Sequence, residues 1–230
     1  MPSDLSEIEK QLGISFTDKD LLRQVFVHRS YLNENAGFDL AHNERLEFLG
    51  DAVLELVVTE HLYKNYHNPE GELTNWRSAI VRGVMLAEVA QSLSIGDYLF
   101  LSRGEQKSGG KARQLILANT FEAFIGALYL DKGYEAAQAF IGQHLLVRLA
   151  PIIENKLYLD AKSRLQELSQ ERFGVTPSYR VLSENGPDHS KSFKVGVYVG
   201  DKPMGEGSGS SKQNAEQAAA TNALSGLNII

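Results

Sequence analysis

The chain has 230 residues, of which 43% are hydrophobic and 23% are charged, and its formal net charge at pH 7 is −6. This composition is typical of a soluble globular protein of one or two domains, and it is too apolar for a disordered chain. The absence of cysteine excludes disulfides, zinc–thiolate sites and cysteine nucleophiles, and it favours a reducing compartment.

The sequence shows neither an export signal nor a membrane span. Its N-terminal segment is polar and acidic, without the basic and apolar regions of a signal peptide. The main apolar runs, Leu115–Ala118 and Phe121–Leu130, are interrupted and too short to cross a bilayer. We therefore expect a cytoplasmic protein that makes no membrane contact.

The charge is unevenly distributed along the chain. Positive and negative side chains balance from Asp160 onward, so the whole excess of acid lies upstream. A negative net charge argues mildly against a nucleic-acid binder, and any RNA binding would depend on the local placement of basic groups.

Apolar residues recur at helical spacing through the first two thirds of the chain, and no useful length of it alternates like a strand. The expected helices cover residues 4–12, a segment capped by Thr17, a long segment from an Asn43 cap to about Tyr66, and the ranges Trp76–Leu93, Gln114–Asp131 and Tyr134–Ile153. Pro69 and Gly71 follow the end of the long helix, and Gly104–Gly110 is expected to be a loop. Residues 1–155 are therefore predicted to form an all-α domain.

The pattern changes near residue 160, after a short linker. A helix, three strands and an alanine-rich helix are expected in turn, at Ser163–Phe173, Ser178–Leu182, Phe193–Val199, Lys202–Gly207 and Asn214–Leu224. Asn185-Gly186-Pro187 is expected to turn the chain between the first two strands. The order α-β-β-β-α predicts a small α+β domain over residues 160–230.

The long helix from Asn43 to Tyr66 carries a row of acids. Glu44, Glu47, Asp51 and Glu55 fall on one stripe about 80° wide at helical spacing. Most of the remaining circumference is apolar, which indicates a packed helix and not a solvated one. Crowded carboxylates that lose hydration need a cation, or they take up protons. On spacing alone, a metal site and an acidic, partly solvated groove both remain open.

A second helix repeats this logic. Between Leu115 and Leu128 the only polar residues are Asn119, Thr120 and Glu122. Asn119 and Glu122 lie one turn apart on one face, and Gly126 on the same stripe would allow close approach of another helix. Oxygen ligands favour Mg²⁺ or Mn²⁺, and two such ions ~4 Å apart could serve phosphodiester hydrolysis.

The nine residues Asn43–Asp51, with the sequence NERLEFLGD, resemble the signature of the ribonuclease III family. The similarity continues in four collinear segments: His28–Tyr31, Glu70–Leu73, Lys107–Gly110 and Ile116–Ala127. It covers essentially the whole chain in the order of the bacterial enzyme. The resemblance implies a homodimer with two active sites along one valley that binds double-stranded RNA. Each site would cut one strand and leave 5′-phosphates and short 3′ overhangs, in the processing of ribosomal and messenger RNA precursors.

The resemblance also assigns roles to particular acids. Glu47, Asp51 and Glu122 fall on the family's catalytic metal-binding positions, and Glu44 and Glu70 match further acidic positions around the site. We expect Glu47 and Glu122 to hold Mg²⁺, with Mn²⁺ as a substitute. Asp51 would hold a second ion or orient the attacking water. No phosphate-binding glycine motif occurs in the sequence, so no nucleotide cofactor is implied.

Asn119 departs from the family pattern, which has aspartate at this position. An amide oxygen can still ligate Mg²⁺, so Asn119 is kept as a candidate ligand, but it brings no negative charge. Weaker metal binding or a partly disabled enzyme could follow. Two other functions therefore remain open: a catalytically disabled protein that binds double-stranded RNA, and a di-metal phosphohydrolase of small nucleotides. The second gives the C-terminal domain no purpose.

The α-β-β-β-α order of the C-terminal domain resembles a double-stranded-RNA-binding domain, a module that recognises A-form shape more than sequence. By resemblance, Gln166, the loop containing His189, and Lys212 would contact RNA. Ser211 precedes the last helix, whose free N–H groups and dipole attract phosphate beside Lys212. A capped surface helix with one lysine remains the alternative on local sequence. Gln213 stands where the family often has a second basic residue, so dimerisation would have to add avidity.

Overall fold

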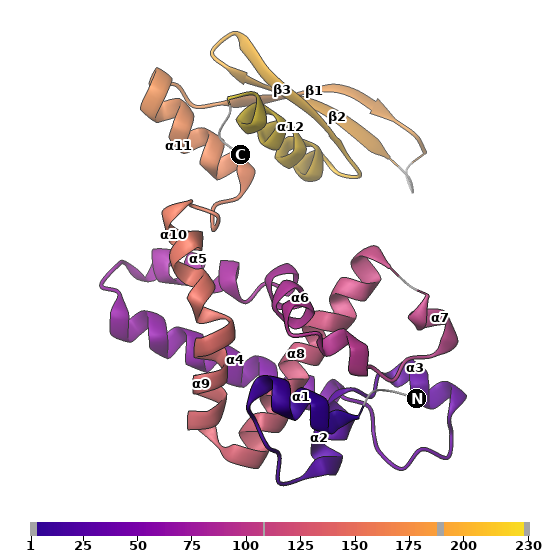
Figure 1. Ribbon diagram of the computed structural model, residues 1–230. Coiled ribbons are helices and arrows are strands. Elements are labelled where there is room, and N and C mark those ends of the chain that lie inside the picture. Colours follow the sequence, from indigo (N-terminus) through magenta and orange to yellow (C-terminus); the bar gives the residue numbers. More distant parts are fainter. Residues whose placement is uncertain (1–3, 108, 188–190, 228–230) are drawn as a thin grey trace. The chain divides into compact units, whose positions relative to one another are not determined.

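The structure is a computed structural model that describes residues 4–107, 109–187 and 191–227. It divides into two compact units, Met1–Asn155 and Lys156–Ile230 (Figure 1). In its described residues the first unit is helical, and the second is a helix, a three-stranded sheet and a helix. The predicted fold class, an all-α domain followed by a small α+β domain, is confirmed.

The first unit contains ten α-helices and two short 3₁₀ turns in its described residues. In chain order they are α1 (Leu5–Leu12), α2 (Lys19–Val25), α3 (Arg29–Glu34), α4 (Glu44–Asn65), α5 (Glu70–Ile80), α6 (Gly83–Ser92), η1 (Ile95–Tyr98), α7 (Arg103–Gln106), α8 (Gly110–Lys132), α9 (Tyr134–His144), η2 (Leu146–Arg148) and α10 (Leu149–Glu154).

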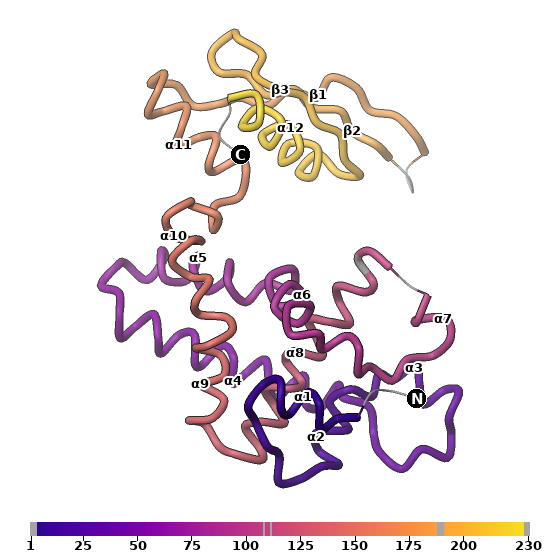
Figure 2. Tube along the Cα trace, viewed as in Figure 1, coloured from indigo at the N-terminus to yellow at the C-terminus, as the bar shows by residue number. Residues whose placement is uncertain are grey.

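Helix α8 forms the centre of this unit and packs against α2, α4, α6 and α9 (Figure 2). Its side chains Phe121, Phe124, Ile125 and Leu128 are at most 1% exposed. A helix covered on several sides is apolar around most of its circumference, which is why the sequence of α8 shows so few polar residues. The few polar residues in the middle of α8 are therefore held in place by the packing of the apolar residues around them.

The cap of α2 differs from the prediction. Asp18, not Thr17, caps this helix, and its carboxylate accepts a hydrogen bond from the Leu21 N–H at 2.9 Å. The Thr17 N–H donates instead to the carboxylate of Asp131 at 2.9 Å. Asn43 does stand at the N-cap of α4, but its side chain donates to the Val25 carbonyl and makes no cap hydrogen bond.

Three other segments were predicted wrongly. Trp76–Leu93 is two helices, α5 and α6, because Arg82 adopts an extended backbone between them. Tyr134–Ile153 is α9, η2 and α10, and Pro151 occupies the first turn of α10, where its missing N–H costs nothing. The expected loop Gly104–Gly110 overlaps α7 at its start.

The segment Tyr134–Glu154 is long and apolar enough to cross a membrane by length and composition alone. Its side chains Phe140, Ile141, Leu145 and Leu149 are at most 3% exposed inside the helical unit. Core helices of soluble proteins meet the same length and composition criteria, so this finding is weak evidence for a membrane span.

The second unit packs α11 (Ala161–Phe173) and α12 (Lys212–Gly226) against one face of an antiparallel sheet of order β1-β2-β3 (Figure 1). The strands are β1 (Ser178–Asn185), β2 (Ser192–Val199) and β3 (Lys202–Gly209). Leu165, Val197 and the alanines of α12 form its small core. A Cβ on Gly207 would lie 2.1 Å from the Ala219 nitrogen, so glycine in β3 is what lets α12 approach the sheet.

Candidate active site

Four predicted ligands lie on two helices that pack together. Glu47 and Asp51 are on α4, and Asn119 and Glu122 are on α8. The Asn119 amide is hydrogen-bonded to the Glu47 carboxylate, and the charges of Glu47 and Asp51 both act on Glu122. The structure therefore brings these four side chains into one cluster, which we call the α4–α8 cluster.

Glu122 is the most strongly perturbed carboxyl of the cluster. Burial, followed by the charges of Asp51 and Glu47, raises its pKa from 4.5 to about 7. A carboxyl with this pKa is about half protonated at neutral pH when no cation is present. A bound cation would reverse the effect, because it favours the charged form of every carboxylate around it.

Glu47 is perturbed in the same direction. Burial raises its pKa, the charges of Glu44 and Asp51 raise it further, and the hydrogen bond with Asn119 opposes them. The Asp51 side chain is exposed. The cluster thus has two half-buried carboxyls, a half-buried amide and one carboxylate open to solvent.

The acidic stripe predicted on α4 does not act as a unit. The Glu55 carboxylate pairs with the Arg77 guanidinium on α5 at 3.1 Å, which makes it part of the α4–α5 contact. Glu44 lies at the edge of the cluster, where its carboxylate is 3.4 Å from the Arg29 guanidinium and 3.7 Å from Nδ1 of His42. Only the middle of the stripe therefore belongs to the cluster.

Glu70 lies away from the α4–α8 cluster within its own chain. It is the first residue of α5 and lines a cavity of about 680 Å³ with Leu62 and Tyr66, at the C-terminal end of α4. Its carboxylate accepts a hydrogen bond from the Thr74 hydroxyl at 2.9 Å. Because α4 rises ~1.5 Å per residue, Glu47 lies more than about 20 Å from this end.

The donor chemistry of the α4–α8 cluster fits a hard divalent cation. Three carboxylates and one amide oxygen are the ligands that Mg²⁺ and Mn²⁺ prefer. Burial first, and then the charges of neighbouring carboxylates, raise the pKa values of Glu47 and Glu122, so their charged forms lack a compensating positive charge. Within the described ranges, however, no three His, Asp or Glu side chains are already arranged to hold an ion. The side chains would have to close around it.

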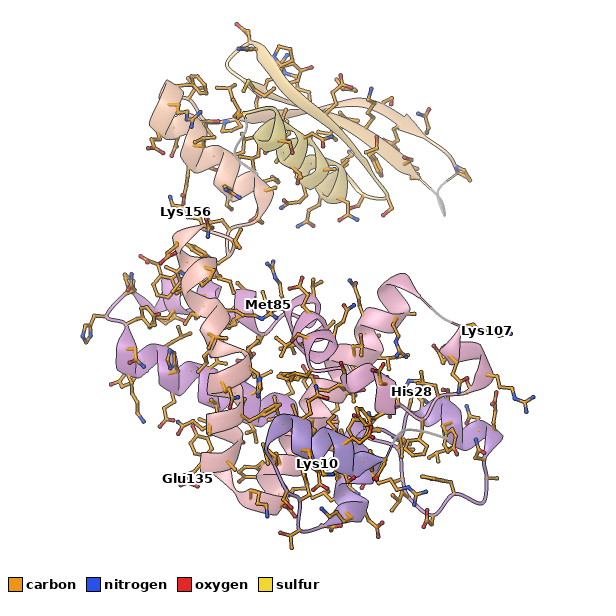
Figure 3. All side chains as sticks on the ribbon, viewed as in Figure 1. Lys10, His28, Met85, Lys107, Glu135 and Lys156 are labelled. Atoms are coloured by element: carbon orange, nitrogen blue, oxygen red, sulfur yellow. The ribbon has the colours of Figure 1, made fainter. Side chains whose placement is uncertain are left out.

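The segment His28–Tyr31 borders this region at the start of α3. His28, which is labelled in Figure 3, caps α3. Its Nδ1 lies 2.7 Å from the Ser30 hydroxyl, which accepts the Ser102 N–H at 3.1 Å. These contacts fasten α3 to the segment before α7. Lys107 is exposed, whereas Ser108 lies outside the described residues.

In the second unit, two of the predicted RNA contacts lie at the start of α12. The Ser211 hydroxyl accepts the Asn214 N–H at 3.1 Å and caps the helix. Lys212 is exposed, and its ammonium lies 5.8 Å from the centre of the Phe193 ring. This end of the helix combines a lysine with the positive end of the helix dipole, which suits a phosphate.

Gln166 is exposed on α11 and lines a polar cavity of about 270 Å³ together with Lys162 and Gln213. Gln213 is the residue that replaces the second basic side chain of the family pattern, and the fold places it beside a predicted RNA contact. The predicted contact His189 lies outside the described residues.

Sequence reasoning missed two contacts of this site. Arg29 pairs with Glu44 across the α3–α4 junction, and in the sequence only the similarity of His28–Tyr31 to the family indicates that region. Gln213 lines the same cavity as Gln166, whereas the sequence shows only that it replaces a basic residue. In both cases the partner comes from another element, which spacing along one helix does not reveal.

Comparison with known proteins agrees with both units. Residues 18–149 match the family described as Ribonuclease-III-like, and residues 161–227 match the double-stranded RNA binding motif. The chain is 46% identical over 226 residues to Ribonuclease 3 of Oceanobacillus iheyensis, covering 98% of this chain and 99% of that protein. It is 46% identical over 216 residues to Ribonuclease 3 of Streptococcus sanguinis, covering 94% of this chain and 93% of that protein.

A solved structure gives the same result for the helical unit. The nuclease domain of ribonuclease III from Campylobacter jejuni matches with a TM-score of 0.54 and 39% identity, over 64% of this chain and 95% of that chain. Its description refers to structural flexibility in a region involved in dimer formation. The family match covers more than half of this sequence, and the chain therefore belongs to the ribonuclease III family of endoribonucleases.

Proposed function

We propose that this endoribonuclease cleaves double-stranded RNA in a metal-dependent reaction that leaves 5′-phosphates and short 3′ overhangs. The observation that carries the proposal is the α4–α8 cluster, in which Glu122 has a pKa of about 7 beside Asp51 and Glu47. Carboxyls that are buried and also crowded together in this way indicate a site built for a cation.

Each side chain of the cluster has a proposed role. Glu47, Asn119 and Glu122, which are half-buried, would hold Mg²⁺, or Mn²⁺ in its place. When bound, the ion would supply positive charge at the phosphodiester and lower the pKa of water. Asp51 is exposed and therefore faces the side from which RNA and water arrive. Its carboxylate would accept a hydrogen bond from the attacking water and orient it, or it would contribute to a second ion.

The second unit would hold the substrate. Gln166 on α11 and the Ser211–Lys212 end of α12 offer hydrogen-bond donors and one positive charge to the RNA backbone. Because positive and negative side chains balance from Asp160 onward, the affinity of this unit for RNA is expected to be modest at physiological salt. Two linked copies would bind more tightly than one.

A homodimer would supply that second copy. Helix α4 exposes Phe48, Leu56 and Tyr63, with exposed fractions of 81%, 57% and 79%. At ~100° per residue they form a stripe directly beside the acidic one. An apolar stripe of this kind is typical of a protein interface. A dimer formed there would place two clusters on one assembly, one for each RNA strand. We further propose that the enzyme works in the cytoplasm on ribosomal and messenger RNA precursors.

One observation favours a second function. Asn119 supplies an amide where a carboxylate would add charge, so the cluster has a lower affinity for cations than a set of four acids. The protein would then act as a double-stranded-RNA-binding protein that does not cut. The two functions differ in whether bound RNA is cleaved.

The test of the proposed function uses the full chain and three substrates of equal length: a paired RNA, the same RNA strand alone and a DNA duplex. The proposal predicts cleavage of the paired RNA alone, with Mg²⁺ and not with EDTA. Product ends should be ligatable 5′-phosphates with short 3′ overhangs. Equal cleavage of single-stranded RNA, or products with 5′-hydroxyls, would contradict it.

A further inference from the structure

Helices α4 and α8 are in backbone contact where each has a glycine. A Cβ built on Gly50 would lie 1.8 Å from the backbone oxygen of Glu122, and one built on Gly126 would lie 2.2 Å from that of Leu46. Neither distance is compatible with a real side chain. With any other residue, the two backbones would have to separate by roughly 1 Å or more.

These two contacts involve the peptide units that carry the predicted ligands. Gly50 touches the backbone of Glu122 itself and directly precedes Asp51. Gly126 touches the carbonyl of Leu46, which directly precedes Glu47. A shift at either glycine would therefore move a ligand on one helix away from its partners on the other.

A divalent ion of this type tolerates little displacement. Mg²⁺ requires near-octahedral oxygens at ~2.0–2.1 Å, so a separation of the helices by about half that length would open the ligand set. Side chains in such sites must usually be held to within ~0.5 Å. The missing side chains of the two glycines thus set the ligand spacing across α4 and α8.

We propose that Gly50 and Gly126 are positioning residues for metal binding. Their role is to hold Glu47 and Asp51 at the correct distance from Asn119 and Glu122, and it rests on the proposed metal site. Close packing alone is the competing explanation. Gly207 shows that this chain also uses glycine for helix contact in the second unit, where no metal ligand has been proposed.

The experiment compares Gly50→Ala and Gly126→Ala with two controls in the full chain. Gly142→Ala replaces a glycine of α9 that has no atom within 4 Å of its built Cβ, so it tests the effect of alanine in a helix. Leu149→Ala removes a core side chain of α10 that is 1% exposed, so it destabilises the unit away from the α4–α8 contact. The readouts are Mn²⁺ affinity by calorimetry without RNA, the melting temperature in EDTA, and binding of paired RNA in EDTA.

The proposal predicts that both glycine variants fold and bind paired RNA in EDTA as the unmodified chain does. Their dissociation constant for Mn²⁺ should rise by at least about tenfold. Leu149→Ala should melt at a lower temperature and keep its Mn²⁺ affinity, and Gly142→Ala should keep both.

Three outcomes would overturn the proposal. Unchanged Mn²⁺ affinity in a folded glycine variant would reduce the glycines to packing residues. If neither variant folded even at low temperature, the two glycines would be required for folding and not specifically for metal binding. If the unmodified chain itself bound no Mn²⁺, the metal site of the proposed function would fail first, and the positioning role would fail with it.

Discussion

The carboxyl of Glu122 is protonated up to near neutral pH because it is buried beside Asp51 and Glu47. Its folded pKa of about 7 exceeds the value of 4.5 expected for the unfolded chain. Below pH 4.5 both states are protonated and the difference has no effect on stability. Between these two values the unfolded state loses its proton first, so the free energy of unfolding falls as pH rises.

This linkage gives a prediction for the metal-free protein. Burial lowers the pKa values of His28, His61 and His144, which changes stability in the opposite direction, so the prediction concerns the difference between two proteins. In EDTA, the change in the free energy of unfolding from pH 5 to pH 8 should be more negative for the unmodified chain than for Glu122→Gln, by on the order of 1–3 kcal/mol after allowance for screening. Urea unfolding followed by fluorescence reports the nuclease unit, since Trp76 is the chain's one tryptophan. The same pH dependence in both proteins would contradict the assigned environment of Glu122.

Asn119 gives the second prediction at this scale. Asn119→Asp adds a fourth carboxylate to the cluster, so the affinity for Mn²⁺ should rise several-fold, while stability in EDTA at pH 8 should fall. Calorimetry and urea unfolding measure the two effects. A matched control is Asn155→Asp, which adds the same charge at an exposed position after α10. Equal effects from both variants would mean that net charge, and not the cluster, controls metal affinity.

At the scale of elements, helical periodicity explains why the sequence could predict that the candidate ligands lie together. It places Glu47 and Asp51 on one face of α4, and Asn119 and Glu122 on one face of α8, whatever the rest of the fold does. The packing of α4 against α8 was expected from Gly126. Helical periodicity, together with Gly126, was therefore sufficient to predict that these four side chains form the α4–α8 cluster.

The parts that were missed depend on contacts between elements. Glu55 has the same spacing as the ligands, but Arg77 on α5 neutralises it. The N-cap of α2 is Asp18 and not the predicted Thr17, because Thr17 is held by Asp131 at the end of α8, which accepts the Thr17 N–H. The helical spacing of apolar residues continues from α9 into α10, so the sequence predicted one helix there. Pro151 was the one residue that could have indicated the break. Such details are set by tertiary partners.

Helix α12 carries the prediction that belongs to this scale. Lys212→Gln should weaken binding of paired RNA in EDTA and reduce the slope of log affinity against log salt by about one, because one phosphate contact is lost. Lys202→Gln is the matched control, since Lys202 pairs with Val199 at the opposite end of the β2–β3 ladder from Phe193, the strand residue beside Lys212. If Lys212→Gln left the slope unchanged, the start of α12 would not contact the RNA backbone.

At the scale of the whole molecule, the exposed stripe on α4 is proposed as the dimer interface. Phe48→Asp places a charge at an apolar side chain that is 81% exposed in the single chain, so it should not destabilise the monomer. Sedimentation should show the monomer mass in place of the dimer mass. Phe173→Asp, at a phenylalanine of α11 that is 50% exposed, should leave the dimer intact. If the Phe48→Asp protein remained dimeric, the exposed stripe on α4 would not be the dimer interface.

In the proposed function, the α4–α8 cluster would cut RNA that the second unit holds. The proposal separates these two steps, because RNA binding would need no metal and strand cutting would. Binding and cutting must be measured separately because of Asn119. Its amide is the feature that would make the chain a binding protein in place of an active enzyme.

The most direct test is a titration of Mg²⁺ with a long, fully paired RNA and three proteins: the unmodified chain, Glu122→Gln and Asn119→Asp. We predict that the unmodified chain cuts both strands, that Glu122→Gln binds the RNA without cutting it, and that Asn119→Asp cuts at lower Mg²⁺. RNA that is bound but uncut by the unmodified chain at every Mg²⁺ concentration, with cutting only by Asn119→Asp, would contradict this account and identify a disabled enzyme that holds duplex RNA.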